Sequence, residues 1–146
     1  MLRPIVLATA VSGVLDILWA MILTLWFGRE IPNMLRFVAS GPFPEATEWG
    51  APGALLGLVV HFALMAAMAA AFVLAARRWP MLLERPWLAG IGYGLVTYVV
   101  MNWIVVPLRF DSPLPPKAVS VATQLFAHVV LVGIPFALIT ARTLRP

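Results

Sequence analysis

Four long runs of apolar residues, each broken by only a few polar side chains, dominate the pattern along the chain. They cover about residues 4–27, 52–76, 86–107 and 118–141. A helix rises about 1.5 Å per residue, so about 20 residues cross the roughly 30 Å hydrocarbon core of a bilayer. The pattern predicts an all-α, polytopic membrane protein: a four-transmembrane-helix antiparallel bundle that forms a single membrane domain over residues 1–146.

The first run starts like a signal peptide, because Arg3 supplies a basic residue ahead of the apolar stretch. That stretch is longer than the roughly 7–15 residues of a signal peptide, so we expect a helix that is retained. Pro4 suits the first turn of such a helix, and Gly28 suits its end.

The link between the first and second runs contains a shorter helical pattern. Four apolar residues recur there on one helical face: Ile31, Met34, Leu35 and Val38. Pro32 suits the first turn of this segment and Gly41 suits its end. The link therefore predicts a short interfacial helix in the first outer loop, and an ordered cap over the bundle is an alternative compatible with it.

The composition fits lipid as the solvent. Of the 146 residues, 62% are hydrophobic and 11% are charged, whereas a soluble domain has about 25% charged residues. Cysteine is absent, which excludes disulfides, zinc–thiolate sites and iron–sulfur clusters. The ten Lys and Arg residues lie near the ends of the runs, so we expect the lipid bilayer, and no nucleic acid, as a partner.

These basic residues are divided unequally between the two sides of the predicted bundle. If the N-terminus is cytoplasmic, the inner side holds Arg3, Arg77, Arg78, Arg85, Arg142 and Arg145. The outer side then holds Arg29, Arg36, Arg109 and Lys117. Because cytoplasmic loops carry an excess of Lys and Arg, both termini are predicted to be cytoplasmic.

Small and polar residues recur four positions apart within the runs, which places them on one helical face. The stripes comprise Ser12, Gly13 and Asp16; Gly53, Gly57 and His61; Gly90, Gly94, Tyr98 and Asn102; and Ser120, Gln124 and His128. Small residues let helices approach, and polar groups avoid lipid, so the stripes should face the bundle interior. The GxxxG pattern of Gly90 and Gly94 serves packing within this bundle or between subunits.

Counting from the outer ends of the runs places Asp16, His61 and His128 at a similar depth, ~13–17 Å in at the helical rise. We therefore predict that they converge in a polar intramembrane site, with three polar neighbours: Asn102, Tyr98 and Gln124. The plain alternative is a hydrogen-bonded network that only fixes the bundle. Ionisable residues inside membranes are more often functional, which favours a site.

Several chemistries stay open for this site. A proton or ion path would use Asp16 and the histidines, because imidazole titrates near neutral pH. A b-type haem would use His61 and His128 as axial ligands, although Asp16 would place a charge at the level of the porphyrin. A metal ion would use the two imidazoles and the carboxylate, and Met65 and Met68 would suit copper(I), although methionine is more often a core filler. No serine–histidine–acid order, phosphate loop or HExxH pattern is present, so no motif supports an enzyme.

The chain resembles a group of small bacterial inner-membrane proteins of unassigned activity. Six motifs carry this resemblance: SGVLDI (12–17), MLRFVASG (34–41), GLVVHF (57–62), PWLAG (86–90), MNWIVVPL (101–108) and LFAH (125–128). The last three runs are also remotely similar to the YagU-like family of inner-membrane proteins, in which two histidines correspond to His61 and His128. The resemblance implies a bacterial inner-membrane location and no mechanism. The stretch PFPE after Gly41 departs from the glycine-rich pattern of the group.

Together these features predict a small transport or permeation protein for an unidentified solute or ion. Four helices rarely enclose a wide pathway, so we expect a homo-oligomer. A single-haem or metal-binding membrane redox protein is one alternative. An accessory or structural membrane subunit without a site is the other.

Overall fold

A computed structural model describes residues 1–144, so Arg145 lies outside the described residues. Those residues form helices and connecting turns, with no strand among them. Four helices are long and apolar enough to cross a membrane, as expected of a multi-pass membrane protein: Leu2–Trp26, Gly50–Arg78, Pro86–Phe110 and Ala118–Leu144. The predicted all-helical class and the four long apolar helices are confirmed.

The first two long helices are α1 (Leu2–Trp26) and α3 (Gly50–Arg78), which are continuous. The third and fourth are each divided by a π-helical segment. The third consists of α5 (Pro86–Val99), η2 (Val100–Val105) and α6 (Val106–Phe110). The fourth consists of α7 (Ala118–Phe126), η3 (Ala127–Gly133) and α8 (Ile134–Leu144). Shorter elements in the links are α2 (Ile31–Ala39), η1 (Pro44–Glu48) and α4 (Met81–Glu84).

The third helix does not end at Pro107, as the sequence suggested, but continues to Phe110. Pro107 lies in the first turn of α6, directly after the π-helical segment η2. A proline interrupts a helix because it removes an N–H donor, and it is tolerated in a first turn, where that donor lacks a helical acceptor. The change of hydrogen-bond pattern before Pro107 therefore lets the helix pass through it.

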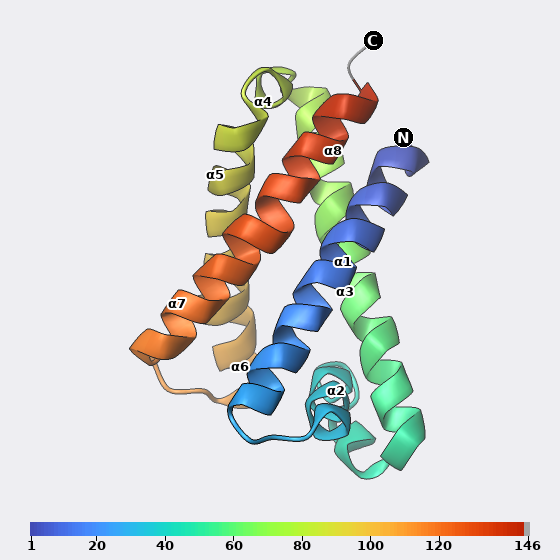
Figure 1. Cartoon of the computed structure of the whole chain (residues 1–146), viewed down its shortest axis with the longest axis vertical. Coiled ribbons are helices and arrows are strands. Elements are labelled where there is room, and N and C mark those ends of the chain that lie inside the picture. The colour runs from blue at the N-terminus through green and yellow to red at the C-terminus, as the bar shows by residue number, and fades with distance from the viewer. Residues whose placement is uncertain (145–146) are drawn as a thin grey trace.

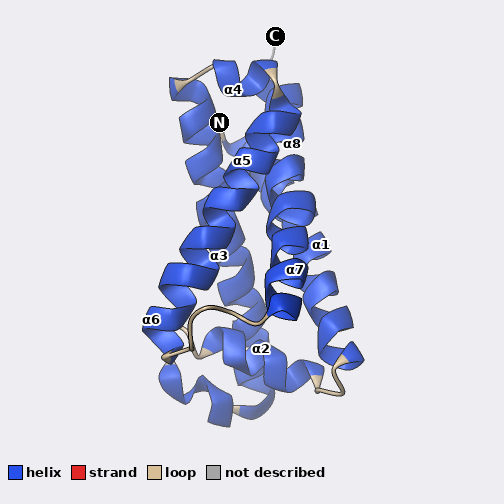
Figure 2. Cartoon of the chain, turned by 90° about the vertical axis from the view of Figure 1, so that its left-hand side faces the viewer, coloured by secondary structure: helices blue, strands red, loops and turns tan. Residues whose placement is uncertain are grey.

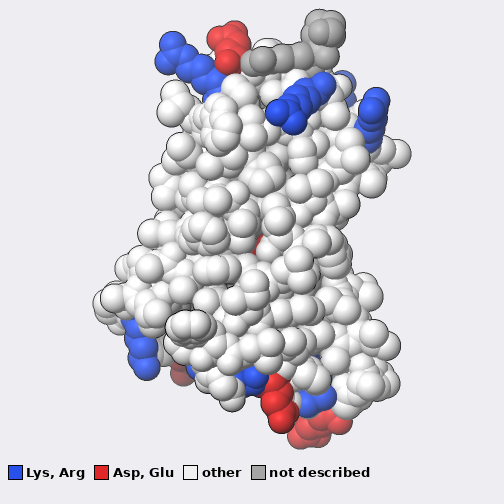
Figure 3. Space-filling view, viewed as in Figure 1, with Lys and Arg blue, Asp and Glu red and all other residues white. Residues whose placement is uncertain are grey.

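The N-terminus, the described end of α8 and α4 lie together at one end of the molecule, here called the α4 end (Figure 1). The short helix α2 lies at the opposite end, here called the α2 end, where α6 also lies (Figures 1 and 2). The space-filling view shows charged side chains gathered at these two ends, with a nearly uncharged belt between them (Figure 3). Only 17% to 33% of each apolar window is buried, so most apolar side chains of the belt face outward. This distribution suits a lipid solvent.

Helix α5 packs chiefly on η3 and α8 of the fourth helix, although the link from α3 to α5 is short. Three glycines explain why α5 packs closely on the fourth helix. A Cβ atom on Gly90 would lie 2.6 Å from the Cα atom of Ile134, and one on Gly94 would lie 2.6 Å from that of Val129. A Cβ atom on Gly133 would overlap the backbone of Gly90. The GxxxG pattern is therefore used for close helix packing within the chain.

Helix α2 packs on the α2 end of α3. A Cβ atom on Gly57 would collide with the backbone of Leu35, so the two helices cross in near-contact. Arg109 also fastens α2, because its Nε donates to the Gly41 carbonyl oxygen at 2.6 Å and its Nη2 donates to that of Ser40 at 2.7 Å. The end of the third helix thus satisfies carbonyl groups at the C-terminus of α2, where helices leave acceptors unpaired.

Candidate functional site

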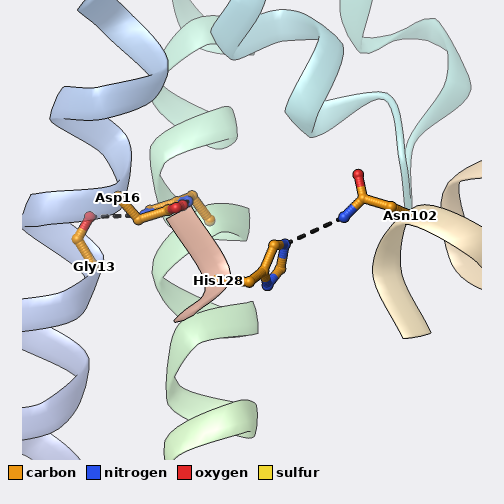
Figure 4. A network of polar contacts seen from close by, with 5 residues as sticks. Gly13, Asp16, Asn102 and His128 are labelled. Carbon is orange, nitrogen blue, oxygen red and sulfur yellow. Dashed lines mark hydrogen bonds and ion pairs between the residues drawn. The ribbon is translucent and has the colours of Figure 1, made fainter. Parts of the chain in front are cut away.

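The pair of Asp16 and His61 joins α1 to α3 inside the apolar belt. The His61 Nε2 atom lies 2.9 Å from the carbonyl oxygen of Gly13, and its Nδ1 atom lies 3.9 Å from Asp16 Oδ2. Both imidazole nitrogens therefore face groups of α1, and Figure 4 shows Gly13 and Asp16 on that helix. The His61 side chain is 9% exposed and the Asp16 side chain is 21% exposed. Of the three residues predicted to converge, Asp16 and His61 therefore lie close together.

Glycine at position 13 makes this approach possible. A Cβ atom there would lie 2.5 Å from Cε1 of the Phe62 ring, so Phe62 lies directly against the backbone of α1. The His61 and Phe62 rings pack edge to face at 5.1 Å. Two consecutive residues of α3 therefore contact Gly13. Phe62 packs against its backbone, and His61 bonds to its carbonyl oxygen.

The hydrogen bonds fix where the protons of this pair can lie. A backbone carbonyl only accepts hydrogen bonds, so His61 Nε2 carries a proton and donates a hydrogen bond to the Gly13 carbonyl oxygen. A second proton on this pair would be held either by His61 Nδ1 or by the carboxyl group of Asp16, and the pair would have no net charge in either case. This arrangement avoids an unpaired carboxylate in an apolar medium, which is strongly unfavourable. The 3.9 Å gap exceeds hydrogen-bond length, so proton exchange requires a small approach or a bridging water.

His128 belongs to a second polar cluster, on the third and fourth helices. Its Nδ1 atom lies 3.2 Å from Thr97 Oγ1, whose own hydroxyl donates to the Gly94 carbonyl oxygen at 3.0 Å. Thr97 must then accept from His128, which makes Nδ1 the protonated nitrogen. The unprotonated Nε2 lies 3.4 Å from Asn102 Nδ2, which also donates to the Tyr98 carbonyl oxygen at 3.2 Å. Both nitrogens of a neutral His128 imidazole are therefore hydrogen-bonded.

The two π-helical segments face each other through this cluster. Asn102 lies within η2 and His128 lies within η3. Both segments precede a proline by two residues, Pro107 and Pro135 respectively. Short π-helical segments occur frequently at functional sites, since they redirect side chains that a regular helix would place elsewhere. The sequence offered only the two prolines as a signal, from which a kink in the fourth helix could be expected.

The predicted site residues therefore form two groups. Asp16 contacts His61, whereas His128 contacts Asn102 and lies with its ring centroid 6.2 Å from that of Tyr98. No hydrogen bond or ion pair joins the two groups within residues 1–144, as Figure 4 illustrates. The side chain of Gln124 is half-buried and bonds to neither group in the described chain.

The histidine nitrogens that would bind a haem iron are engaged. Nε2 of His61 bonds to Gly13, and Nε2 of His128 bonds to Asn102. Axial ligation would require the rings to leave these partners or to rotate. For a metal ion, residues 1–144 contain no group of three His, Cys, Asp or Glu side chains with ligand geometry. Met65 lies in the apolar core with Phe72 and Phe136, which is the packing role that methionine usually has.

Three residues make specific polar contacts that the sequence pattern did not predict: Thr97, Arg109 and Trp19. Trp19 Nε1 donates to the Thr123 carbonyl oxygen at 3.2 Å, which ties α1 to α7. Its ring packs on Phe126 at 4.7 Å. Trp19 lies far from the ends of its apolar run, and this position indicates such a contact because a buried indole N–H requires an acceptor.

Comparison of the chain with protein-family models, with curated proteins and with solved structures found no match. The resemblance to the YagU-like family therefore stays a prediction. The function must be argued from the two polar groups and their positions in the fold.

Proposed function

We propose that the protein is a small proton-linked transport or permeation protein in which Asp16 and His61 form the proton-carrying site. One observation carries this proposal: His61 Nε2 bonds to the Gly13 carbonyl, so the Nδ1 atom is turned toward the Asp16 carboxyl group, 3.9 Å away. Proton relays in membrane proteins use such carboxylate and imidazole groups inside the bilayer. The Asp16 side chain is 21% exposed, so the pair remains accessible from outside the packed core.

Two hydroxyl groups extend from this pair toward the α4 end. Ser12 and Thr9 precede Asp16 by four and seven residues, which places all three on one face of α1. Ser12 is fully buried, and neither hydroxyl has a hydrogen-bond partner within the described chain. Unsatisfied buried polar groups are unfavourable unless water or a ligand completes them. They support a hydrated route from Asp16 over about 10 Å toward the α4 end.

The proposed setting is an antiparallel bundle in the bacterial inner membrane with the α4 end in the cytoplasm. Among the described residues, the α4 end holds five arginines and Glu84: Arg3, Arg77, Arg78, Arg85 and Arg142. The α2 end holds equal numbers of basic and acidic residues: Arg29, Arg36, Arg109 and Lys117 with Glu30, Glu45, Glu48 and Asp111. This asymmetry favours cytoplasmic termini, and α2 would then lie at the outer interface as a cap.

Self-association is part of the proposal, because four helices with a filled core enclose no wide path. Large apolar side chains remain exposed around the belt, which leaves surface for a second copy as well as for lipid. Cross-linking of the protein in liposomes is expected to capture a defined oligomer. Only monomers under conditions that support flux would contradict this part.

Proton flux tests the assigned site. Purified protein in liposomes with an internal pH indicator and an imposed potential should conduct protons, and Asp16→Asn should reduce the flux to that of protein-free liposomes. Glu48→Gln is the matched control, because it removes an exposed carboxylate at the α2 end. Equal flux from Asp16→Asn and the unchanged protein would refute the role of Asp16.

An accessory or structural subunit is the second candidate, and the His128 cluster favours it. This imidazole is neutral and fully bonded, so it joins η2 to η3 without a charge to transfer. A structural protein would show no flux in liposomes, and Asp16→Asn would alter only its stability.

A visible spectrum of the purified protein tests the redox alternative, since haem bound by His61 and His128 would give an absorption band that His61→Ala removes.

A further inference from the structure

A separate apolar hollow opens between α3 and α5 beneath α4. Its volume is about 440 Å³, and its walls include Phe72, Ala75, Arg85, Gly92, Tyr93 and Val96. It exists because α5 packs on the fourth helix and stands away from α3. The Tyr93 hydroxyl crosses its inner side and donates to the Met68 carbonyl oxygen at 2.7 Å, so this group offers no free donor to the hollow. Figure 2 shows α4 at the top of the molecule, above α5.

The depth of the hollow matches one leaflet of a bilayer. Arg85 lies at its α4 end and Val96 lies eleven residues further along the chain. At the helical rise this separation is about 16 Å, close to half of the roughly 30 Å hydrocarbon core. A lipid acyl chain spans the same distance from the headgroup level to the midplane.

One basic side chain, Arg85, lines the hollow at its α4 end. Arg85 is exposed, and its side chain makes no ion pair or hydrogen bond with any residue of 1–144. Trp79 and Trp87 flank it in sequence and are 56% and 60% exposed. Tryptophan favours the headgroup level of a membrane, so these residues place Arg85 where lipid phosphates lie. The remaining walls are apolar, which suits a hydrocarbon chain better than a polar solute.

We propose that this hollow, the lipid groove, binds one anionic phospholipid from the α4 side. Its phosphate pairs with the Arg85 guanidinium, and one acyl chain lies along Gly92 and Tyr93 toward Val96. The excess of arginine over glutamate at the α4 end attracts anionic headgroups to this leaflet. The proposal is independent of the proton site, because neither Asp16 nor His61 lines the groove.

Native mass spectrometry of the full chain in detergent tests it, with phosphatidylglycerol or phosphatidylcholine added as the probe. The unchanged protein is expected to retain one phosphatidylglycerol in preference to phosphatidylcholine. Gly92→Leu should abolish retention, because a Cβ atom at Gly92 meets no other atom within 4 Å and a leucine side chain would fill the groove without displacing backbone. Arg85→Ala should weaken retention of phosphatidylglycerol about fivefold, the effect of one arginine near an anionic lipid surface.

Two controls are matched to these changes. Ala71→Leu adds apolar bulk at an exposed position of α3 outside the groove, and Arg78→Ala removes an exposed arginine at the same end. Both should retain phosphatidylglycerol like the unchanged protein. Equal retention in Gly92→Leu and Ala71→Leu, or equal losses in Arg85→Ala and Arg78→Ala, would overturn the proposal. A change of oligomeric state in Gly92→Leu without loss of lipid would overturn it in favour of a second copy of the chain.

Discussion

Asn102 donates a hydrogen bond to His128 across 3.4 Å, and this contact joins the two π-helical segments of the protein. Each residue lies in a part of its helix where the regular hydrogen-bond pattern is interrupted. The contact directs both side chains into the interior and leaves the imidazole neutral. It therefore separates the two histidines by role: His128 fastens helices, whereas His61 faces a carboxyl group.

Loss of the Asn102 amide is expected to destabilise the fold. Asn102→Ala leaves His128 Nε2 without its donor, and hydrogen bonds between membrane helices contribute about 1 kcal/mol. The apparent melting temperature in detergent should fall. Gln124→Ala is the control, because the Gln124 side chain makes no hydrogen bond in the described chain, and its melting temperature should not change. A larger fall for Gln124→Ala than for Asn102→Ala would contradict this assignment.

His61→Gln is expected to separate stability from flux. Glutamine retains an N–H donor for the Gly13 carbonyl but has no group that titrates, so the fold should persist while proton flux in liposomes disappears. The melting temperature and the flux are measured on the same preparation. Flux that survives in a folded His61→Gln protein would remove His61 from the proton path.

Two glycines of α5 offer a direct comparison of packing. In Gly94→Ala the new Cβ atom would lie 2.6 Å from Val129 Cα, so α5 and η3 must move apart, and overpacking of this kind costs about 1–3 kcal/mol. In Gly92→Ala the Cβ atom meets no neighbour within 4 Å, and alanine favours the helix by up to about 1 kcal/mol. Thermal unfolding should show a lower melting temperature for Gly94→Ala only. The reverse order would show that α5 does not pack on η3 in this way.

Arg109 is expected to hold α2 in place. Arg109→Ala removes both donors to the Ser40 and Gly41 carbonyl oxygens, and each charge-assisted hydrogen bond contributes about 1.5–3 kcal/mol at most. Backbone amides of α2 should then exchange hydrogen faster, as measured by mass spectrometry. Arg29→Ala removes an exposed arginine at the same end that makes no side-chain bond in the described chain, so exchange in α2 should not change. Unaltered exchange in Arg109→Ala would show that α3 alone fixes α2.

The sequence by itself determined the four long helices, because uninterrupted apolar runs of this length satisfy their backbone hydrogen bonds in lipid only as helices. It also identified the polar residues, since carboxylate, imidazole and amide groups are conspicuous in such runs. Four-residue spacing placed them on one face of each helix, and counting placed Asp16 and His61 at one depth, where the structure brings them together.

The tertiary structure alone decided which polar residues meet. Helix rotation and register depend on the close approaches at Gly13, Gly90 and Gly133, and a periodic pattern does not state which neighbour each glycine contacts. Asn102 and His128 lie in π-helical segments, where the chain departs from the regular helix, and they contact each other and not Asp16 or His61. The lipid groove likewise exists because α5 packs on the fourth helix and not on α3, the long helix that precedes it in the sequence.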